Sequence, residues 1–388
     1  MSDNSTIIKN ANILTMDNQF NVFSNGFVKI KNGLIESVGD NFEKNSQEVE
    51  KILDAKGGLV IPGLINCHTH AAMSLFRSLG DDEADRLIRY IFPLEMKHVS
   101  PEFVRIGTEL SCAEMLLSGI TFFADMYFFE EQVALVAEKM GIRVLAGQTV
   151  MNRNIPDAKN FEEGLIRAKI FCKDWSQHPL VIPCIAPHAP YSLEEKQLNK
   201  INEFANANDV DIQMHVAESD REKKYILNKD QKSSVDYLSS LNFLSERLLA
   251  SHCIHVDNDD MNLLLDHQCR VSHNPVANTK GAHGTCPLYE LLEKKHPVGS
   301  EIEGIITSTN EYAIYLKIND FEIDGFLHSN DLSYAGNPEE ELKNYNKGDR
   351  LKVKVLEIKK NDQKVRVGLK QIQPDPFHWF SNKKVNDT

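Results

Sequence analysis

The sequence predicts an α/β fold, with a small β element before it and an all-β module after it. From about residue 60 to residue 290, strand-like apolar runs alternate with stretches whose apolar residues recur at helical spacing. From about residue 297, short alternating runs separated by turn residues follow one another closely. Strand–helix alternation over about 230 residues is typical of a parallel sheet curled into a barrel.

Composition excludes several classes of protein. The chain has 388 residues, enough for two or three domains, and a formal net charge of -13, which argues against a broad electropositive surface. No apolar run approaches a membrane span, and the first residues lack the basic start of a signal peptide. The seven cysteines show no Cys-x-x-Cys spacing, so we expect reduced thiols in a cytoplasmic protein without a membrane partner. The sequence leaves the oligomeric state open.

The first sixty residues carry β-prone runs at 7–10, 27–30 and 34–38, with turn residues at 31–33. They predict a partial β-sandwich over residues 1–60. Further strands are expected at 59–65, 121–126, 143–148, 180–186, 211–216, 248–253 and 269–272, with helices such as 103–117, 131–140 and 194–206 between them. Seven strands are counted where a closed barrel of this type needs eight, so residues 61–294 are predicted to form an incomplete (β/α) barrel.

The C-terminal part has a different pattern. Strands are expected at 300–308, 312–318, 326–327, 351–358 and 365–369, with one longer connection before the fourth. Five short strands in about 80 residues predict a Greek-key barrel of the OB type over residues 297–373. The polar residues 374–388 are expected to form a flexible tail.

Histidines mark the carboxyl ends of the predicted barrel strands, where barrels of this kind place their chemistry. Five of the seven strand ends carry one, which packing alone explains poorly because buried imidazoles need polar partners. Neutral imidazoles that converge are common metal ligands, so the pattern predicts a metal site. The histidines concerned are His68, His70, His188, His215, His252 and His273.

These strand ends resemble a known family. The runs at 68–70, 215–218, 251–253 and 271–278 are similar to motifs of the amidohydrolase superfamily, in its branch of S-adenosylhomocysteine/5'-methylthioadenosine deaminase-like aminohydrolases, over residues 5–294. The resemblance implies one zinc ion (or Fe²⁺) per chain, held by His68, His70 and His215. It also implies that metal-bound hydroxide attacks a purine nucleoside-like small molecule, which loses ammonia.

The same resemblance assigns further roles. It implies that Glu218 and His252 handle protons and that Glu95 and His188 contact the substrate. For Glu218, an ordinary salt bridge with Arg221 or Lys223 is the structural alternative. Departures from the family pattern at 85–87 and Gln148 leave open another amino-heterocycle as substrate.

One expected ligand has no counterpart. The family resemblance implies an Asp at the end of an eighth strand, and the matching pattern stops near residue 292, one helix earlier. The sequence therefore predicts an incomplete metal set and doubtful turnover. Asp125 and Asp324 are the acids that would have to replace the ligand, and we expect neither to do so.

The C-terminal module resembles the ribosomal-protein-S-one-type RNA-binding motif, on residues 299–304, 311–315, 324–328, 331–333 and 365–371. The resemblance implies single-stranded RNA or the ribosome as partner. Its stacking face would be Tyr312, Tyr315 and Phe326, with His328, Lys364 and Arg366 as polar or phosphate contacts. The alternative is that these aromatic side chains only fill a small barrel.

Two functions fit these observations. The first is an adenosine-type deaminase fused to an RNA-binding module. The second is a non-enzymatic single-stranded RNA-binding protein that carries a vestigial or artificially joined barrel. Sequence alone does not separate a natural fusion from an artificial one.

Overall fold

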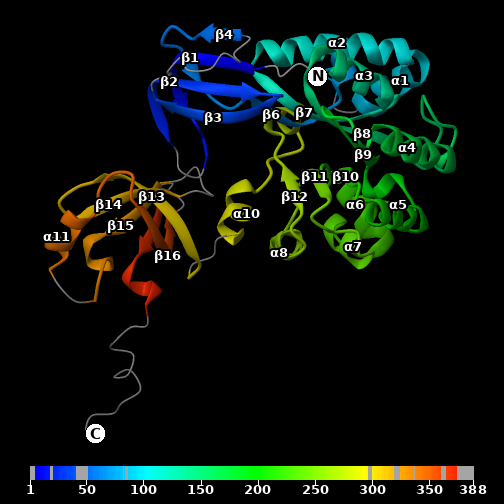
Figure 1. Cartoon of the computed structure of the whole chain (residues 1–388). Helices are drawn as coiled ribbons and strands as arrows, with labels where there is room; N and C mark the ends of the chain where they lie inside the picture. The colour runs from blue at the N-terminus through cyan, green and yellow to red at the C-terminus, as the bar shows by residue number, and fades with distance from the viewer. Residues whose placement is uncertain are drawn as a thin grey trace, which may run out of the picture. The chain divides into compact units, whose positions relative to one another are not determined.

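The computed structural model describes residues 5–17, 21–40, 51–81, 83, 86–295, 299–318, 324–334, 337–359 and 364–373. The predicted tail at 374–388 lies outside them. The chain divides into two compact units, Gly63–Lys294 and the combination of Met1–Pro62 with Lys295–Thr388. Figure 1 shows the elements in chain order.

The N-terminal segment forms a small sheet, as predicted. Its strands are β1 (Ser5–Leu14), β2 (Val22–Lys31), β3 (Leu34–Asp40) and β4 (Lys51–Asp54), in the order β3-β2-β1-β4, and β5 (Leu59–Val60) pairs with β1. Asn32 and Gly33 join β2 to β3 and both have positive φ, 52° and 79°. That conformation suits a two-residue hairpin loop, which explains the turn.

The larger unit is built on a parallel sheet with strand order β12-β11-β10-β9-β8-β7-β6 (Figure 1). Its strands are β6 (Leu64–Thr69), β7 (Ile120–Tyr127), β8 (Arg143–Val150), β9 (Val181–Pro187), β10 (Asp211–Val216), β11 (Leu248–His252) and β12 (Arg270–Ser272). In the described residues β6 and β12 each pair with one neighbour only. The prediction of a seven-stranded, incomplete barrel is confirmed.

The predicted strand 59–65 was wrong in one respect. Pro62 and Gly63 interrupt the run, and the chain forms β5 in the N-terminal sheet and β6 in the barrel sheet. Proline supplies no N–H for a ladder, so it divides what the apolar pattern joins. His68 therefore lies within β6, and His70 follows its last residue, Thr69.

Helices alternate with the barrel strands (Figure 1). Some of them begin at residues that satisfy their first N–H groups: Ser100 accepts from Phe103 N, and Asn160 accepts from Glu163 N. The helices are α1 (Phe92–His98), α2 (Pro101–Leu117), α3 (Glu130–Met140), α4 (Phe161–Trp175), α5 (Glu195–Asn208), α6 (Asp220–Asp230), α7 (Ser234–Ser240), α8 (Asn258–Asp266), α9 (Pro275–Lys280) and α10 (Leu288–Lys295).

Helix α2 holds the turn that follows His70, η1 (Ala71–Phe76). Gly107 faces this turn, and a Cβ there would lie 2.4 Å from the carbonyl oxygen of Ala72. Only glycine permits so close a backbone approach. Ser111 Oγ adds a hydrogen bond to Ala71 O at 2.7 Å, so the segment after His70 is fixed on two sides.

The C-terminal module is a closed five-stranded barrel, as predicted, with strand order β13-β14-β15-β17-β16. Its strands are β13 (Glu301–Thr309), β14 (Ala313–Ile318), β15 (Asp324–His328), β16 (Arg350–Lys359) and β17 (Lys364–Gly368), with the short helix α11 (Pro338–Glu341) before β16. Alternate residues such as Ile314, Leu316, Val353 and Val367 are fully buried in it. Among all described helices, none has the length and apolar character that crossing a bilayer requires.

Candidate metal and nucleic-acid sites

The barrel sheet brings histidines from distant parts of the sequence to its carboxyl end. His68 comes from β6, His215 from β10 and His252 is the last residue of β11, while His188 follows β9. His215 pairs in register with Ser251, and Val216 pairs with His252. The rings of His215 and His252 therefore lie one residue apart along adjacent strands.

The imidazole rings contact one another closely. The ring centre of His68 lies 5.0 Å from that of His70, 4.9 Å from that of His215 and 5.1 Å from that of His252. His188 joins the group at 4.9 Å from His215. The five rings therefore form one group, which we call the histidine cluster: His68, His70, His188, His215 and His252.

Hydrogen bonds orient the rings. His70 Nδ1 lies 2.5 Å from the carbonyl oxygen of Met126, and His215 Nδ1 lies 2.8 Å from that of His188. A carbonyl only accepts, so both Nδ1 atoms carry the proton and both Nε2 atoms carry a lone pair. These two Nε2 atoms are 3.2 Å apart. Facing lone pairs repel unless a cation or a proton lies between them, so this pair of nitrogens could hold a cation.

The charges in the cluster favour the same conclusion. Removal from water, together with the neighbouring imidazoles, holds the pKa of His68, His188 and His215 well below the usual range. Removal from water also lowers the pKa of His70, although the Met126 carbonyl opposes the shift. The rings are therefore neutral at pH 7, the state in which histidine binds metals.

One nitrogen from each of His68, His215 and His252 lies within 4.8 Å of the other two. Histidine nitrogens at this spacing fit zinc or iron. His70, which the sequence resemblance placed among the ligands, reaches the same group through His215. In the described residues this group contains no carboxylate, and Asp125 directs its Oδ1 to Ala71 N at 2.6 Å. Asp324 lies in the C-terminal barrel, on β15.

Glu218 lies beside the cluster, two residues after the end of β10. Its Oε1 is 3.7 Å from His252 Nε2 and 3.9 Å from His283 Nε2. Among the described residues, the basic side chains beside the Glu218 carboxylate are thus imidazoles and not Arg221 or Lys223. His252 Nδ1 donates to Asn278 Oδ1 at 2.7 Å, which leaves its Nε2 facing Glu218.

Glu95 lies on α1 and is buried. It accepts a hydrogen bond from the Tyr127 hydroxyl at 2.8 Å. Burial raises the pKa of Glu95 to about 7, although the Tyr127 hydroxyl and the charge of Arg153 oppose the shift. Tyr127 in turn lies 6.1 Å from His70, ring centre to ring centre, which links Glu95 to the cluster through one side chain.

Sequence reasoning missed several polar partners of the cluster. Ser251 Oγ lies 3.0 Å from His68 Nδ1, and Asn278 holds His252. Both fall inside motifs that the sequence displays, Ser-His at 251–252 and Asn-Pro at 274–275 followed by Asn278. The spacing of Ser251 and Asn278 along the chain does not predict which imidazole each would hydrogen-bond. Glu222 was also missed, and its contacts are described below.

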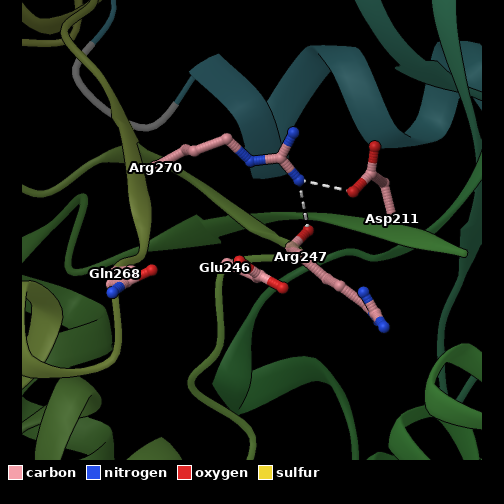
Figure 2. A pocket seen from close by; sticks show the side chains of 5 residues that line it. All are labelled: Asp211, Glu246, Arg247, Gln268 and Arg270. Carbon is pink, nitrogen blue, oxygen red and sulfur yellow. Dashed lines mark hydrogen bonds and ion pairs between the residues drawn. The ribbon is translucent and has the colours of Figure 1, made fainter. Parts of the chain in front are cut away.

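A separate cavity of about 360 Å³ lies at the opposite end of the strands (Figure 2). Arg270 Nη2 donates to Asp211 Oδ1 at 2.5 Å and to the Arg247 carbonyl at 2.8 Å, tying the starts of β10, β11 and β12 together. Since catalytic groups of parallel barrels lie at the carboxyl ends, this cavity is structural in character. It is lined by Asp211, Glu246, Arg247, Gln268 and Arg270.

On the C-terminal barrel, aromatic side chains share the outer face of adjacent strands. Tyr315 pairs in register with Phe326, and their ring centres are 5.7 Å apart. Phe326 and His328 are two residues apart on β15, with ring centres 6.2 Å apart. All three are partly exposed, whereas their strand neighbours Ile314 and Leu327 are buried inside. These rings therefore lie outside the barrel interior.

The polar residues of this face differ in their contacts. Arg366 lies in register with Phe326, and its Nη2 donates to the buried Asp331 at 2.7 Å. Lys364 is exposed and pairs in register with Asp324. Tyr312 is 56% exposed and precedes β14, so it stands in the loop and not in the strand. Lys364 and Tyr312 are thus open to a ligand, while the guanidinium of Arg366 already pairs with the Asp331 carboxylate.

Comparison with known proteins identifies two families along the chain. A model of the amidohydrolase family matches residues 59–311, and a model of the S1 RNA binding domain matches residues 295–370. The chain is 36% identical over 313 residues to the 5-methylthioadenosine/S-adenosylhomocysteine deaminase 1 of Syntrophus aciditrophicus (strain SB), covering 80% of this chain and 71% of the relative. It is 36% identical over 311 residues to a 5'-deoxyadenosine deaminase of Methanosarcina acetivorans, covering 78% and 70%.

Solved structures agree on the fold. An adenosine deaminase from Xanthomonas campestris with bound zinc superimposes with a TM-score of 0.70 at 28% identity. The match covers 74% of this chain and 66% of that chain. A guanine deaminase from C. acetobutylicum superimposes with a TM-score of 0.68 at 20% identity, over 75% and 72%. The chain therefore spans 66% to 72% of the length of these proteins.

Proposed function

Because the chain belongs to the amidohydrolase family, we propose that its barrel is a metal-dependent aminohydrolase of an adenosine-type nucleoside and that its C-terminal module binds single-stranded RNA. The observation that carries the enzymatic part is the pair of Nε2 atoms of His70 and His215, 3.2 Å apart with their Nδ1 protons directed away. Relatives named for methylthioadenosine, S-adenosylhomocysteine and 5'-deoxyadenosine support the substrate class.

The histidine cluster supplies the metal site in this proposal. His68, His70 and His215 would hold zinc or Fe²⁺, with His252 close enough to join them. When bound, zinc would lower the pKa of a coordinated water to about 7 and so supply the hydrolytic nucleophile at neutral pH. The neutral state of the rings fits this role.

The remaining steps fall to side chains of the chain. The overall reaction adds one water to the amino-bearing carbon of the purine ring and releases ammonia. His252, oriented by Asn278, would accept a proton from the attacking water at its Nε2. Glu218, 3.7 Å from that nitrogen, would take this proton from His252 and deliver it to the ring nitrogen of the substrate. Glu95 and His188 would contact the nucleoside.

Ammonia release tests this proposal. The zinc-loaded chain is incubated with S-adenosylhomocysteine, 5'-methylthioadenosine or 5'-deoxyadenosine, and ammonia is measured. We expect release with at least one of them, and its loss in His215→Ala and Glu218→Gln. His178→Ala is the matched control, because His178 is a histidine of the same unit that pairs with Glu138 away from the cluster. No release by the wild-type chain would refute the enzymatic part.

A second function, RNA binding without catalysis, is favoured by the aromatic face of the C-terminal barrel. Exposed or half-exposed rings on adjacent strands are the arrangement on which bases of single strands stack. Retention of RNA binding by a chain that binds no zinc and releases no ammonia would favour this function over the first.

A further inference from the structure

Glu222 is a buried acid that the proposed chemistry does not use. It lies in the first turn of α6 and is 1% exposed. Its Oε1 accepts the backbone N–H of Ala217 at 2.8 Å and the Ser234 hydroxyl at 2.6 Å, and its Oε2 accepts the N–H of Glu218 at 3.2 Å. Both oxygens are therefore engaged by the turn that carries Glu218.

That turn has an unfavourable backbone conformation. Ala217 has a φ of 52°, in the left-handed region that residues with a Cβ rarely adopt. Such conformations persist only where the surrounding contacts enforce them, and they concentrate at functional sites. The two N–H groups that Glu222 accepts belong to Ala217 and to the next residue, so the carboxylate is one of the contacts that hold this conformation.

The same turn holds the loop that carries His252. The carbonyl of Ala217 accepts N–H groups from Ile254 at 3.0 Å and His255 at 2.9 Å, and Val216 O accepts from Cys253 N at 3.0 Å. His252 and Cys253 also have positive φ, 78° and 45°. Two strained turns on adjacent strands are thus joined by backbone hydrogen bonds, and Glu222 anchors the first of them.

We propose that Glu222 is a positioning residue, whose carboxylate fixes the 216–218 turn and thereby sets Glu218 against His252. The inference rests on the proposed deaminase function, since it assigns Glu222 to the geometry of that proton-handling pair. In the described residues, the hydrogen bonds of the Glu222 carboxylate are to Ala217, Glu218 and Ser234 and not to the histidine cluster. Its loss should therefore alter proton transfer while leaving metal binding intact.

The test is Glu222→Gln in the full chain. Glutamine has one acceptor oxygen in place of two, so it can accept only one of the two N–H groups. We expect kcat to fall 10- to 100-fold, with KM within threefold of wild type and zinc content unchanged. Asp260→Asn is the matched control: Asp260 is likewise buried in the first turn of a helix, accepts Ser233 Oγ and Asp257 N, and should leave kcat unchanged.

Two further measurements keep the outcome decisive. Crystal structures of zinc-loaded wild type and Glu222→Gln should differ in the separation of Glu218 Oε1 from His252 Nε2, which needs no turnover to measure. If wild type releases no ammonia, the proposed function fails, and this comparison still decides the role of Glu222. If Glu222→Gln does not fold, Ser234→Ala removes one partner and should lower kcat 2- to 10-fold. An unchanged kcat together with an unmoved Glu218 would overturn the inference.

Discussion

The hydroxyl of Ser251 offers a sharp test of how the cluster is built. It is fully buried and lies 3.0 Å from His68 Nδ1, so it fixes the orientation of a proposed ligand without being one. Removing such a partner lowers metal affinity 10- to 100-fold in comparable sites. At about 1.4 kcal/mol per tenfold change, Ser251→Ala should weaken zinc binding by roughly 1.4 to 2.8 kcal/mol. A lost neutral hydrogen bond, worth about 1 kcal/mol, accounts for the lower end.

The adjacent strand supplies the control. Ser272 pairs in register with Ser251, is also buried, and bonds to Asn274 in place of an imidazole. Zinc affinity is measured by competition with a chromophoric chelator near neutral pH, for wild type and both alanine variants. Ser251→Ala should bind zinc at least tenfold more weakly, and Ser272→Ala should match wild type. Equal affinity in Ser251→Ala, or an equal loss in both variants, would refute the orientation argument.

Three further predictions follow from the same geometry. His252→Gln should keep one zinc per chain by elemental analysis but lose ammonia release by at least 100-fold, whereas loss of zinc would make His252 a ligand. Burial raises the pKa of Glu95 from 4.5 to about 7, so its contribution to stability is complete below pH 4.5 and is lost as pH rises through 7. The difference in unfolding free energy between wild type and Glu95→Gln, measured in urea, should therefore fall by roughly 3 kcal/mol over that window at ~1.4 kcal/mol per pKa unit, and parallel curves would contradict it. Phe326→Ala should weaken binding of a single-stranded RNA in a fluorescence titration by about 5- to 150-fold, since stacking on one ring is worth about 1 to 3 kcal/mol per base. The control is Lys352→Ala, which should bind normally because Lys352 pairs with Glu301 on other strands.

The sequence predicted the barrel because its period is visible along the chain. Strand–helix alternation and histidines at strand ends placed His68, His188, His215 and His252 at one edge of a sheet, where the structure has them. The sequence prediction misplaced the first strand, because a pattern of apolar residues takes no account of Pro62. Proline lacks the N–H that a strand ladder needs. The alternation of buried and exposed residues likewise predicted the C-terminal barrel strand by strand.

The partners of these side chains were beyond the sequence. The sequence does not predict the hydrogen bond between Arg366 and Asp331, which are 35 residues apart. That contact depends on how β17 packs beside the turn after β15. The contact of Ser251 with His68 spans 183 residues and depends on the curl of the whole sheet. Glu222 is one of many charged residues on the polar helix α6, and only the fold shows that it is buried.

The central claim is that the histidine cluster is a metal site, and zinc-edge X-ray absorption on the purified full chain tests it most directly. The account predicts one zinc per chain with three or four imidazole nitrogens at about 2.0 to 2.1 Å, and loss of that signal in His215→Ala. A chain without zinc after loading, or zinc with sulfur neighbours at about 2.3 Å, would contradict it.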